Sequence, residues 1–250
     1  ALCNDALLEP DLHQPDRFCD IGDPTEGALV VVAARLGLWK ETLDQTFPRV
    51  AEIPFETERK RMTTVHRLPT AATQLPVSLK SLKSWLCFAK DWPYVAFTKG
   101  GVESLLSISN QVWVNGQVEP LDEGWHQKIM DANNELAQEG MRVLGVAFQG
   151  LKSLPVAEGD QGLEQTLIFI GVIGMLDPAR PEAKDAVLTC KTAGIRPVMI
   201  TGDQPLTAQH IARELAIATL DAPSIGQTLA QLSAEELSIL VEDSSVYARV

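Results

Sequence analysis

Short extended patterns dominate the first 150 residues of the chain. Residues 50–55 and 62–68 are β-branched or alternate between apolar and polar types, with a short polar stretch between them, which is typical of adjacent antiparallel strands. Residues 94–98 predict another strand, and residues 112–114 run into Asn115-Gly116, a common hairpin turn. Together these patterns predict an antiparallel sheet.

A helix is predicted before these strands. Asp23 stands in front of Pro24 and Glu26, and an N-cap aspartate, a proline in the first turn and a glutamate at the third position all favour a helix start. The apolar residues 28–38 continue this helix as a buried element.

The remaining patterns in this half complete an α+β domain. Residues 121–139 predict an amphipathic helix, and residues 143–148 predict a further strand. Residues 1–20 lack periodicity and are expected to form a loop or a frayed helix, and residues 69–84 are expected to form a surface hairpin. We therefore predict that residues 21–150 are one α+β domain built on an antiparallel sheet.

A different pattern follows residues 150–162, where proline, glycine and acidic residues collect. Continuous apolar stretches at 167–175 and 197–200 predict strands that are buried on both faces. They alternate with predicted helices at 181–193 and 206–215. This alternation favours a parallel, doubly wound α/β sheet.

Composition narrows the possible functions. The chain has 250 residues, a formal charge of −12 and a pI near 4.8, so most of its surface would repel nucleic acid. Its longest nearly continuous apolar run has ten residues, whereas a membrane helix needs about 20. The four cysteines and four histidines show no metal-binding spacing, so no metal site is predicted. We expect a soluble piece of a longer protein in a reducing compartment, because the sequence starts at Ala1 without a signal-like segment.

Two short motifs follow the predicted parallel strands. Thr201, Gly202 and Asp203 lie between a strand and a helix, where open α/β sheets bind phosphate groups. Asp177 and Arg180 follow the preceding strand, so both motifs are expected at the same sheet edge. Each motif has an equally plausible structural explanation, since the aspartates can cap helices and the arginine can form a surface ion pair.

A second set of candidates lies in the antiparallel domain. Lys60, Lys99 and Arg142 stand at or near strand ends, and Phe55 could offer an aromatic face to a base. The glycines after Lys99 would allow a planar ligand to approach the backbone. Taken singly, each residue fits a structural role better: Phe55 in the core, the cations at the surface, and Glu26 in a capping box.

Taken in order, eight stretches of the chain resemble P-type ATPases, particularly the type II group of calcium pumps and sodium/potassium pumps. The resemblance covers almost the whole chain. The matching stretches are 1–5 (ALCND), 22–29 (GDPTEGAL), 55–62 (FETERKRM), 97–101 (FTKGG), 141–147 (MRVLGVA), 174–180 (GMLDPAR), 200–203 (ITGD) and 247–250 (YARV).

This resemblance implies a fold and a set of roles. It implies a nucleotide-binding domain over residues 1–160 and part of a haloacid-dehalogenase-like, Rossmann-like phosphorylation domain over residues 161–250. In the first domain, ATP would be held by Glu26, Phe55, Lys60, Lys99, Gly100, Arg142 and Leu144. In the second, the γ-phosphate would be surrounded by Thr201, Gly202 and Asp203, and the hinge side of the site would be ordered by Asp177, Arg180 and Arg249.

The resemblance also has departures. Relatives often have arginine where this chain has Thr57, so one phosphate contact is expected to be either missing, which would weaken ATP binding, or supplied by Arg59 or Arg61. The glycine motif reads KGG instead of KGA, and D-P-P-R reads D-P-A-R. Neither the phosphorylated D-K-T-G-T aspartate nor the magnesium-binding G-D-G-x-N-D occurs, so the chain is expected to bind ATP without hydrolysing it.

The resemblance implies a parent enzyme as well. It would couple ATP hydrolysis, with Mg²⁺, through a phosphoaspartate to transport of a cation, most simply Ca²⁺. This chain would lie on the cytoplasmic face of a membrane beside the actuator domain and transmembrane helices of the same protein. Two alternatives stay open at this point: a soluble haloacid-dehalogenase-like phosphatase, and a module that only binds nucleotide or a partner protein.

Overall fold

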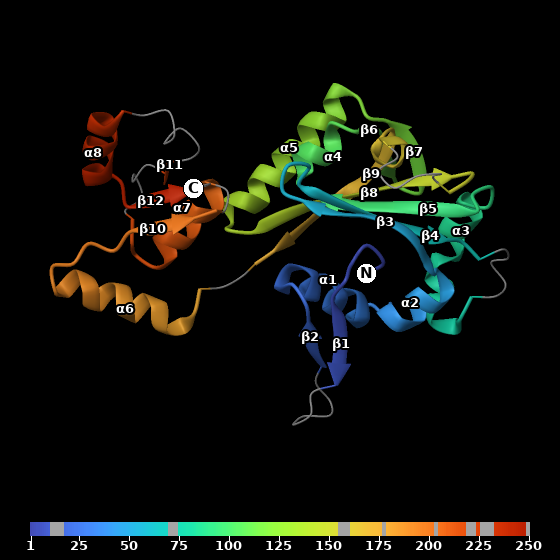
Figure 1. The fold of residues 1–250 in the computed structure, drawn as a ribbon, viewed down its shortest axis with the longest axis horizontal. Helices are drawn as coiled ribbons and strands as arrows, with labels where there is room; N and C mark the ends of the chain where they lie inside the picture. Colours follow the sequence, from blue (N-terminus) through green and yellow to red (C-terminus); the bar gives the residue numbers. More distant parts are fainter. Residues whose placement is uncertain are drawn as a thin grey trace. The chain divides into compact units, whose positions relative to one another are not determined.

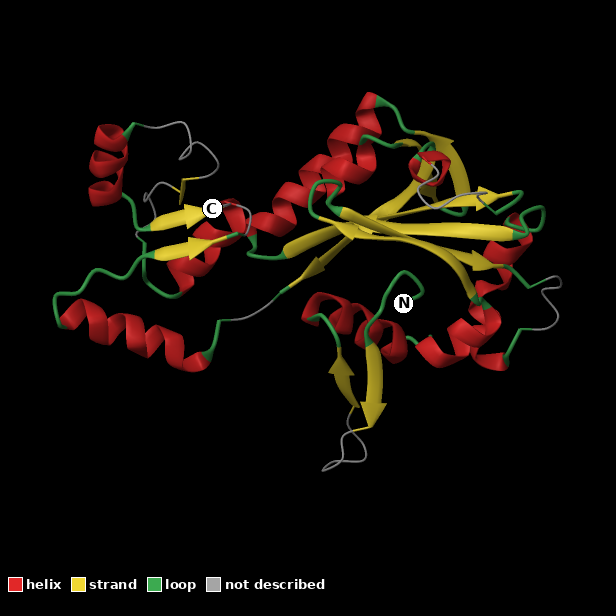
Figure 2. Ribbon diagram, in the orientation of Figure 1, coloured by secondary structure: helices red, strands yellow, loops and turns green. Residues whose placement is uncertain are grey.

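The computed structural model describes residues 1–10, 18–69, 75–154, 161–176, 179–202, 205–218, 224–225 and 233–248. The chain forms two compact units. The first comprises Ala1–Ile129 and Leu144–Ile173, and the second comprises Met130–Val143 and Gly174–Val250. Figure 1 shows the elements of each unit, and Figure 2 separates helices from strands.

A seven-stranded sheet is the centre of the first unit. Its order is β3-β4-β5-β8-β9-β6-β7, and the neighbours from β3 to β8 pair in antiparallel fashion, whereas β6 and β9 are parallel. The strands are β3 (Arg49–Glu56), β4 (Arg61–Arg67), β5 (Tyr94–Gly100), β6 (Ser109–Val114), β7 (Gln117–Pro120), β8 (Arg142–Leu151) and β9 (Leu167–Met175). The predicted antiparallel strands are therefore confirmed.

Helices cover the sheet of this unit. α1 (Pro24–Arg35) and α2 (Lys40–Thr46) lie on one side, and α4 (Val102–Leu106) lies on the other (Figure 1). The side chain of Asp23 accepts hydrogen bonds from the backbone amides of Thr25 and Glu26, so the predicted N-cap of α1 is confirmed. Leu43 of α2 belongs to the same hydrophobic core as Phe148 of β8.

The predicted hairpin at Asn115-Gly116 and the predicted helix end at Gly140 can be compared with the backbone angles of these residues. β6 and β7 form an antiparallel hairpin whose turn residues Asn115 and Gly116 have φ of 49° and 84°. α5 (Glu123–Gln138) ends just before Gly140, which has φ of 81°. The predicted hairpin and helix end are both confirmed.

Two segments differ from the sequence-based expectation. β1 (Leu7–Pro10) and β2 (Phe18–Ile21) pair in antiparallel fashion where a loop or frayed helix was expected, and residues 11–17 between them lie outside the described residues. The expected surface hairpin at 69–84 is wrong for residues 77–84, because η2 (Val77–Leu82) and α3 (Lys83–Phe88) are helical, and residues 70–74 lie outside the described residues. Leu79 and Leu86 are both buried in the core of the first unit, so tertiary packing stabilises a segment that has no visible period in the sequence.

The second unit contains a small parallel sheet. β10 (Met199–Thr201) and β11 (Ser224–Ile225) each pair in parallel with the central β12 (Val246–Ala248). The helices of this unit include α6 (Pro181–Thr192), α7 (Pro205–Glu214) and α8 (Ala234–Asp243). The predicted helices at 181–193 and 206–215, and a parallel arrangement of strands, are confirmed.

The position of β9 corrects the sequence analysis. Its apolar residues were expected in the parallel sheet, but β9 lies between β8 and β6 in the seven-stranded sheet. The expectation that this strand is buried on both faces is also wrong, because Leu167, Ile168 and Phe169 are buried but Ile170 is 40% exposed. An apolar run does not tell to which sheet a strand belongs, so the pattern could not distinguish the two sheets. The motifs after β9 and β10 therefore follow strands of different sheets, and the premise that placed both at one edge is wrong.

The described part of the chain lacks two kinds of feature. No helix there is both long enough and apolar enough to cross a membrane. Among the same residues, no three histidine, cysteine, aspartate or glutamate side chains gather in a way that could hold a metal ion.

Candidate functional site

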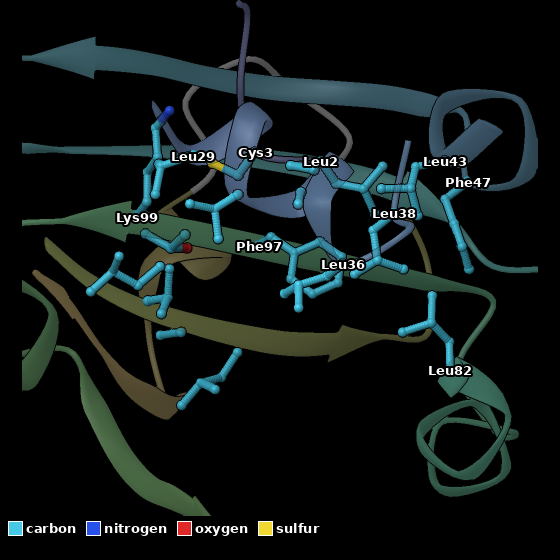
Figure 3. A pocket seen from close by; sticks show the side chains of 18 of the residues that line it. Leu2, Cys3, Leu29, Leu36, Leu38, Leu43, Phe47, Leu82, Phe97 and Lys99 are labelled. Carbon is cyan, nitrogen blue, oxygen red and sulfur yellow. The ribbon is translucent and has the colours of Figure 1, made fainter. Parts of the chain in front are cut away.

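A cavity of about 430 Å³ lies in the first unit, and Figure 3 shows it from close by. Its walls are mostly aliphatic and aromatic and come from α1, the first residues of the chain, β5, β8 and β9. Lys99 of β5 supplies a cationic group to this lining. Of the predicted site residues that the structure describes, Lys99 is the one that lines this cavity, whereas Phe55, Lys60 and Arg142 are not among the lining residues.

Lys99 forms an ion pair with Glu26. The Nζ atom of Lys99 donates to Oε1 of Glu26, although the two residues are 73 positions apart in sequence. Both side chains are largely removed from solvent, with 10% and 16% of their surface exposed. The structure therefore brings together two of the residues that sequence analysis singled out separately, one at a helix start and one at a strand end.

The other carboxylate oxygen of Glu26 binds the first residues of the chain. Oε2 accepts hydrogen bonds from the backbone amides of Asp5 at 2.8 Å and Ala6 at 3.2 Å. Three donors thus hold the carboxylate in one orientation. This role of Glu26 was missed by the sequence analysis, which gave it a structural role only as part of a capping box within α1.

Asn4 anchors the same segment and was also missed. Asn4 is completely buried. Its Nδ2 atom donates a hydrogen bond to the Glu26 carbonyl at 2.8 Å, and its Oδ1 atom accepts one from the Ala6 amide at 2.8 Å. Its own carbonyl oxygen accepts from Lys40 Nζ and from Arg49 Nη2, each at 2.8 Å. The one available signal was the motif ALCND, in which an asparagine follows an otherwise apolar start.

Cys3 lies beside Lys99 in the lining. Its Sγ donates to the carbonyl oxygen of Met62 at 3.4 Å, and Met62 is the direct partner of Lys99 across β4 and β5. Burial raises the pKa of the Cys3 thiol, although the nearby Lys99 ammonium opposes this effect. The thiol therefore stays protonated at neutral pH and is a poor nucleophile.

Lys60 lies in the turn that connects β3 and β4. It has a positive φ of 53°, and its amide donates to the Glu56 carbonyl at 2.7 Å. Its carbonyl accepts from the amide of Gly101 at 2.9 Å. Any Cβ at Gly100 would lie 2.4 Å from that same carbonyl oxygen, so glycine is needed there for close backbone contact with the turn.

Phe55 precedes this turn at the end of β3. It is 59% exposed, so the structural explanation that placed it in the core is wrong, and its ring is available to a ligand. Thr57 lies in the turn itself and is exposed.

Arg59 and Arg61 converge on the buried carboxylate of Glu164. Arg59 Nη1 lies 2.7 and 2.8 Å from the two carboxylate oxygens, Arg61 Nε donates at 2.7 Å, and Thr63 Oγ1 donates at 2.9 Å. Burial alone would raise the pKa of Glu164, but these hydrogen bonds outweigh it and hold the pKa below its ordinary value. Because both guanidinium groups bind Glu164, this geometry argues against either one binding phosphate in place of an arginine at position 57.

The remaining predicted residues lie in several places. Arg142 is the exposed first residue of β8 and belongs to the second unit, whereas Leu144 belongs to the first. Arg180 precedes α6 and is exposed. Thr201 ends β10, and Gly202 after it faces open space. Asp177, Asp203 and Arg249 lie outside the described residues.

Comparison with known proteins shows to which family the chain belongs. A family described as "P-type ATPase, cytoplasmic domain N" matches residues 1–182. The chain belongs to the P-type cation-transporting ATPases. The predicted resemblance is thereby confirmed.

The relatives of this P-type ATPase chain carry transport names. It is 37% identical to "Calcium-transporting ATPase 1" of Bacillus cereus and 37% identical to "Cation-transporting ATPase pma1" of Synechocystis. It is 33% identical to "Calcium-transporting ATPase 1" of Lactococcus lactis. Each comparison covers 100% of this chain but 25% of the relative, so the chain spans about a quarter of the length of the proteins it matches.

Proposed function

We propose that this chain is the ATP-binding part of the cytoplasmic region of a cation-transporting P-type ATPase. The observation that carries the proposal is the Glu26–Lys99 pair, whose lysine lines an apolar cavity within the part of the chain that matches the family. A nucleotide site needs apolar surface with a few well-placed polar groups, and this pair supplies polar groups near the β3–β4 turn, since Lys99 is the partner of Met62 across β4 and β5.

The residues have distinct proposed roles. Phe55 stacks on the adenine ring, because its exposed face stands beside the β3–β4 turn. Lys60 and Lys99 provide positive charge, and Gly100 keeps the backbone of the turn close to β5. Glu26 accepts a hydrogen bond from the base once Lys99 turns to the nucleotide. Arg142 and Leu144, at the start of β8, contact the phosphates and the nucleotide body.

The second part of the chain belongs, in this proposal, to the phosphorylation domain. We assign the nucleotide-binding domain to residues 1–160 and a partial haloacid-dehalogenase-like domain to residues 161–250. In the latter, Thr201, Gly202 and Asp203 face the γ-phosphate, and Asp177, Arg180 and Arg249 order the approach to it. The parallel strands β10, β11 and β12 are compatible with this assignment.

The parent protein would complete the reaction. It would supply the phosphorylated aspartate, the Mg²⁺ ligands, the actuator domain and the membrane helices, and would move a cation, with Ca²⁺ favoured by the names of the relatives. Because neither D-K-T-G-T nor G-D-G-x-N-D occurs in its sequence, this chain by itself is expected to bind ATP without turning it over.

Replacement of Lys99 tests the proposal. Isothermal calorimetry should detect ATP binding by the chain, and Lys99→Gln should raise the Kd by roughly ten- to a hundredfold, since a hydrogen bond to a charged group contributes roughly 1.5–3 kcal/mol. Lys128→Gln is the control, because Lys128 lies over the ring of Trp125 and lines no part of the cavity. No binding at millimolar ATP, or an equal effect of both substitutions, would contradict the proposal.

A further inference from the structure

Glu164 is a buried carboxylate with a complete set of donors. The residue ends the short 3-10 helix η3 (Gln161–Glu164) and is 7% exposed. An isolated buried carboxylate is costly, but here Arg59, Arg61 and Thr63 satisfy both oxygens. Such a carboxylate fixes the position of whatever carries its partners.

The partners of Glu164 lie on the β3–β4 hairpin. Arg59, in the turn, also donates from Nε to Glu56 and from Nη2 to the Pro54 carbonyl, each at 2.7 Å. One guanidinium group therefore joins Glu164 to the last residues of β3. Arg59 therefore holds the turn both to Glu164 and to the strand β3 that precedes it.

Arg61 fastens the other side of the turn. Its Nη1 donates to Oγ of Ser104 at 2.9 Å, and that hydroxyl donates to the Arg59 carbonyl at 2.7 Å. Ser104 belongs to α4, which follows β5. The turn is thus tied to η3 through Glu164 and to α4 through Ser104.

We propose that Glu164 is a positioning residue for the nucleotide site. By holding Arg59 and Arg61, it fixes the turn in the shape that presents Phe55 and the left-handed Lys60 to ATP. The inference rests on the proposed function, because Glu164 can position the turn for ATP only if ATP binds beside the turn. It also explains why two cations next to a nucleotide site are kept away from the phosphates.

The direction in which Glu164→Gln changes the affinity for ATP distinguishes a positioning role of Glu164 from a simple effect of its charge. Glu164→Gln removes a negative charge near a site for an anion, so electrostatics alone would strengthen ATP binding. It would also release two arginines that could then reach phosphate. Loss of positioning has the opposite effect, because a displaced turn moves Phe55 and Lys60 from their places.

The test is ATP titration of the 250-residue chain by calorimetry, with E164Q compared with the unchanged chain. We expect the Kd to rise on the order of tenfold, because a displaced turn weakens the contacts of Phe55 and Lys60 with the nucleotide. Glu52→Gln is the charge-matched control, since Glu52 pairs with Arg49 in the same sheet and is 48% exposed. Val95→Ala is the stability control, because Val95 is fully buried in β5 away from the turn.

Hydrogen exchange gives a reading that does not need nucleotide. The amides of Lys60 and Gly101, which close the turn, should exchange faster in E164Q but not in V95A. Binding in E164Q that is equal to or tighter than in the unchanged chain would overturn this inference and leave the proposed function standing. An equal loss of affinity in V95A would also overturn it, since the effect would then be general destabilisation. Absence of ATP binding by the unchanged chain would overturn the proposed function and this inference with it.

Discussion

At the scale of single residues, two neighbouring glycines have different requirements. A Cβ on Gly100 would lie 2.4 Å from the Lys60 carbonyl oxygen, whereas a Cβ on Gly101 would find its nearest neighbour at 3.9 Å. The sequence motif KGG shows both as equivalent. Only the structure separates the glycine that permits close backbone contact from the one beside it.

Substitution by alanine should therefore distinguish them. Gly100→Ala is expected to lower the free energy of unfolding by about 1–3 kcal/mol, the usual cost of overpacking. Gly101→Ala should change it by no more than about 0.5 kcal/mol, because its added methyl group meets only ordinary contacts. Denaturant unfolding of the two variants measures this difference, and equal losses would contradict the close contact with Lys60.

His66 gives the first unit a dependence on pH. It is completely buried, its Nδ1 lies 2.8 Å from the Phe47 carbonyl, and its Nε2 lies 2.9 Å from Thr64 Oγ1. Burial lowers the pKa of His66, only partly opposed by the Phe47 carbonyl, and the positive charges of Arg49 and Lys40 lower it further. The folded protein therefore favours the neutral imidazole.

Stability should fall on acidification for this reason. Below pH ~6.5 the unfolded chain takes up a proton at His66 that the folded chain resists, so the free energy of unfolding decreases until the folded pKa is reached. Denaturant midpoints at pH 7.5 and 5.5 should show a smaller decrease in His66→Gln than in the unchanged chain. His126→Gln, at an exposed position, is the control and should keep the full decrease.

At the scale of elements, local chemistry decided which predictions succeeded. The N-cap at Asp23 and the turn at Asn115-Gly116 specify their conformations through adjacent atoms, and both were predicted. η2 depends on burial of Leu79, and the β1–β2 hairpin depends on pairing between separate strands. Such contacts leave no local period, so the sequence could not indicate them.

The candidate site shows the same division. Glu26 and Lys99 were singled out from their motifs, but their contact over 73 positions requires the folded sheet. Glu164 lies in a segment without a recognised motif, and its three donors come from residues 59–63. Its role could not be predicted, because a lone glutamate in a polar stretch resembles any solvated surface residue.

At the scale of the whole molecule, the first unit is built from separated parts of the chain. Its sheet includes β9, which stands between β8 and β6 and is joined to β6 in parallel. The edge hairpin of β6 and β7 therefore depends on β9 for its connection to the rest of the sheet. The functional assignment of residues 1–160 does not include this strand.

Two shortened chains should therefore behave differently. A piece covering residues 1–176 retains β9 and should unfold in one cooperative transition. A piece covering residues 1–160 lacks it and is expected to show a broad transition, because β8 and β6 then have no common neighbour. Circular dichroism during heating makes the comparison, and a sharp transition of the shorter piece at the same temperature would contradict this role of β9.

Two cysteines of the first unit differ in their surroundings and so in their expected reactivity. The sulfur of Cys3 donates to the Met62 carbonyl beside Lys99, and burial raises the pKa of its thiol, so an alkylating reagent should modify Cys3 slowly. Cys87 is exposed and should be modified faster. Because unfolding removes this difference, the ratio of the two labelling rates reports whether the first residues of the chain keep their place against β4 and β5.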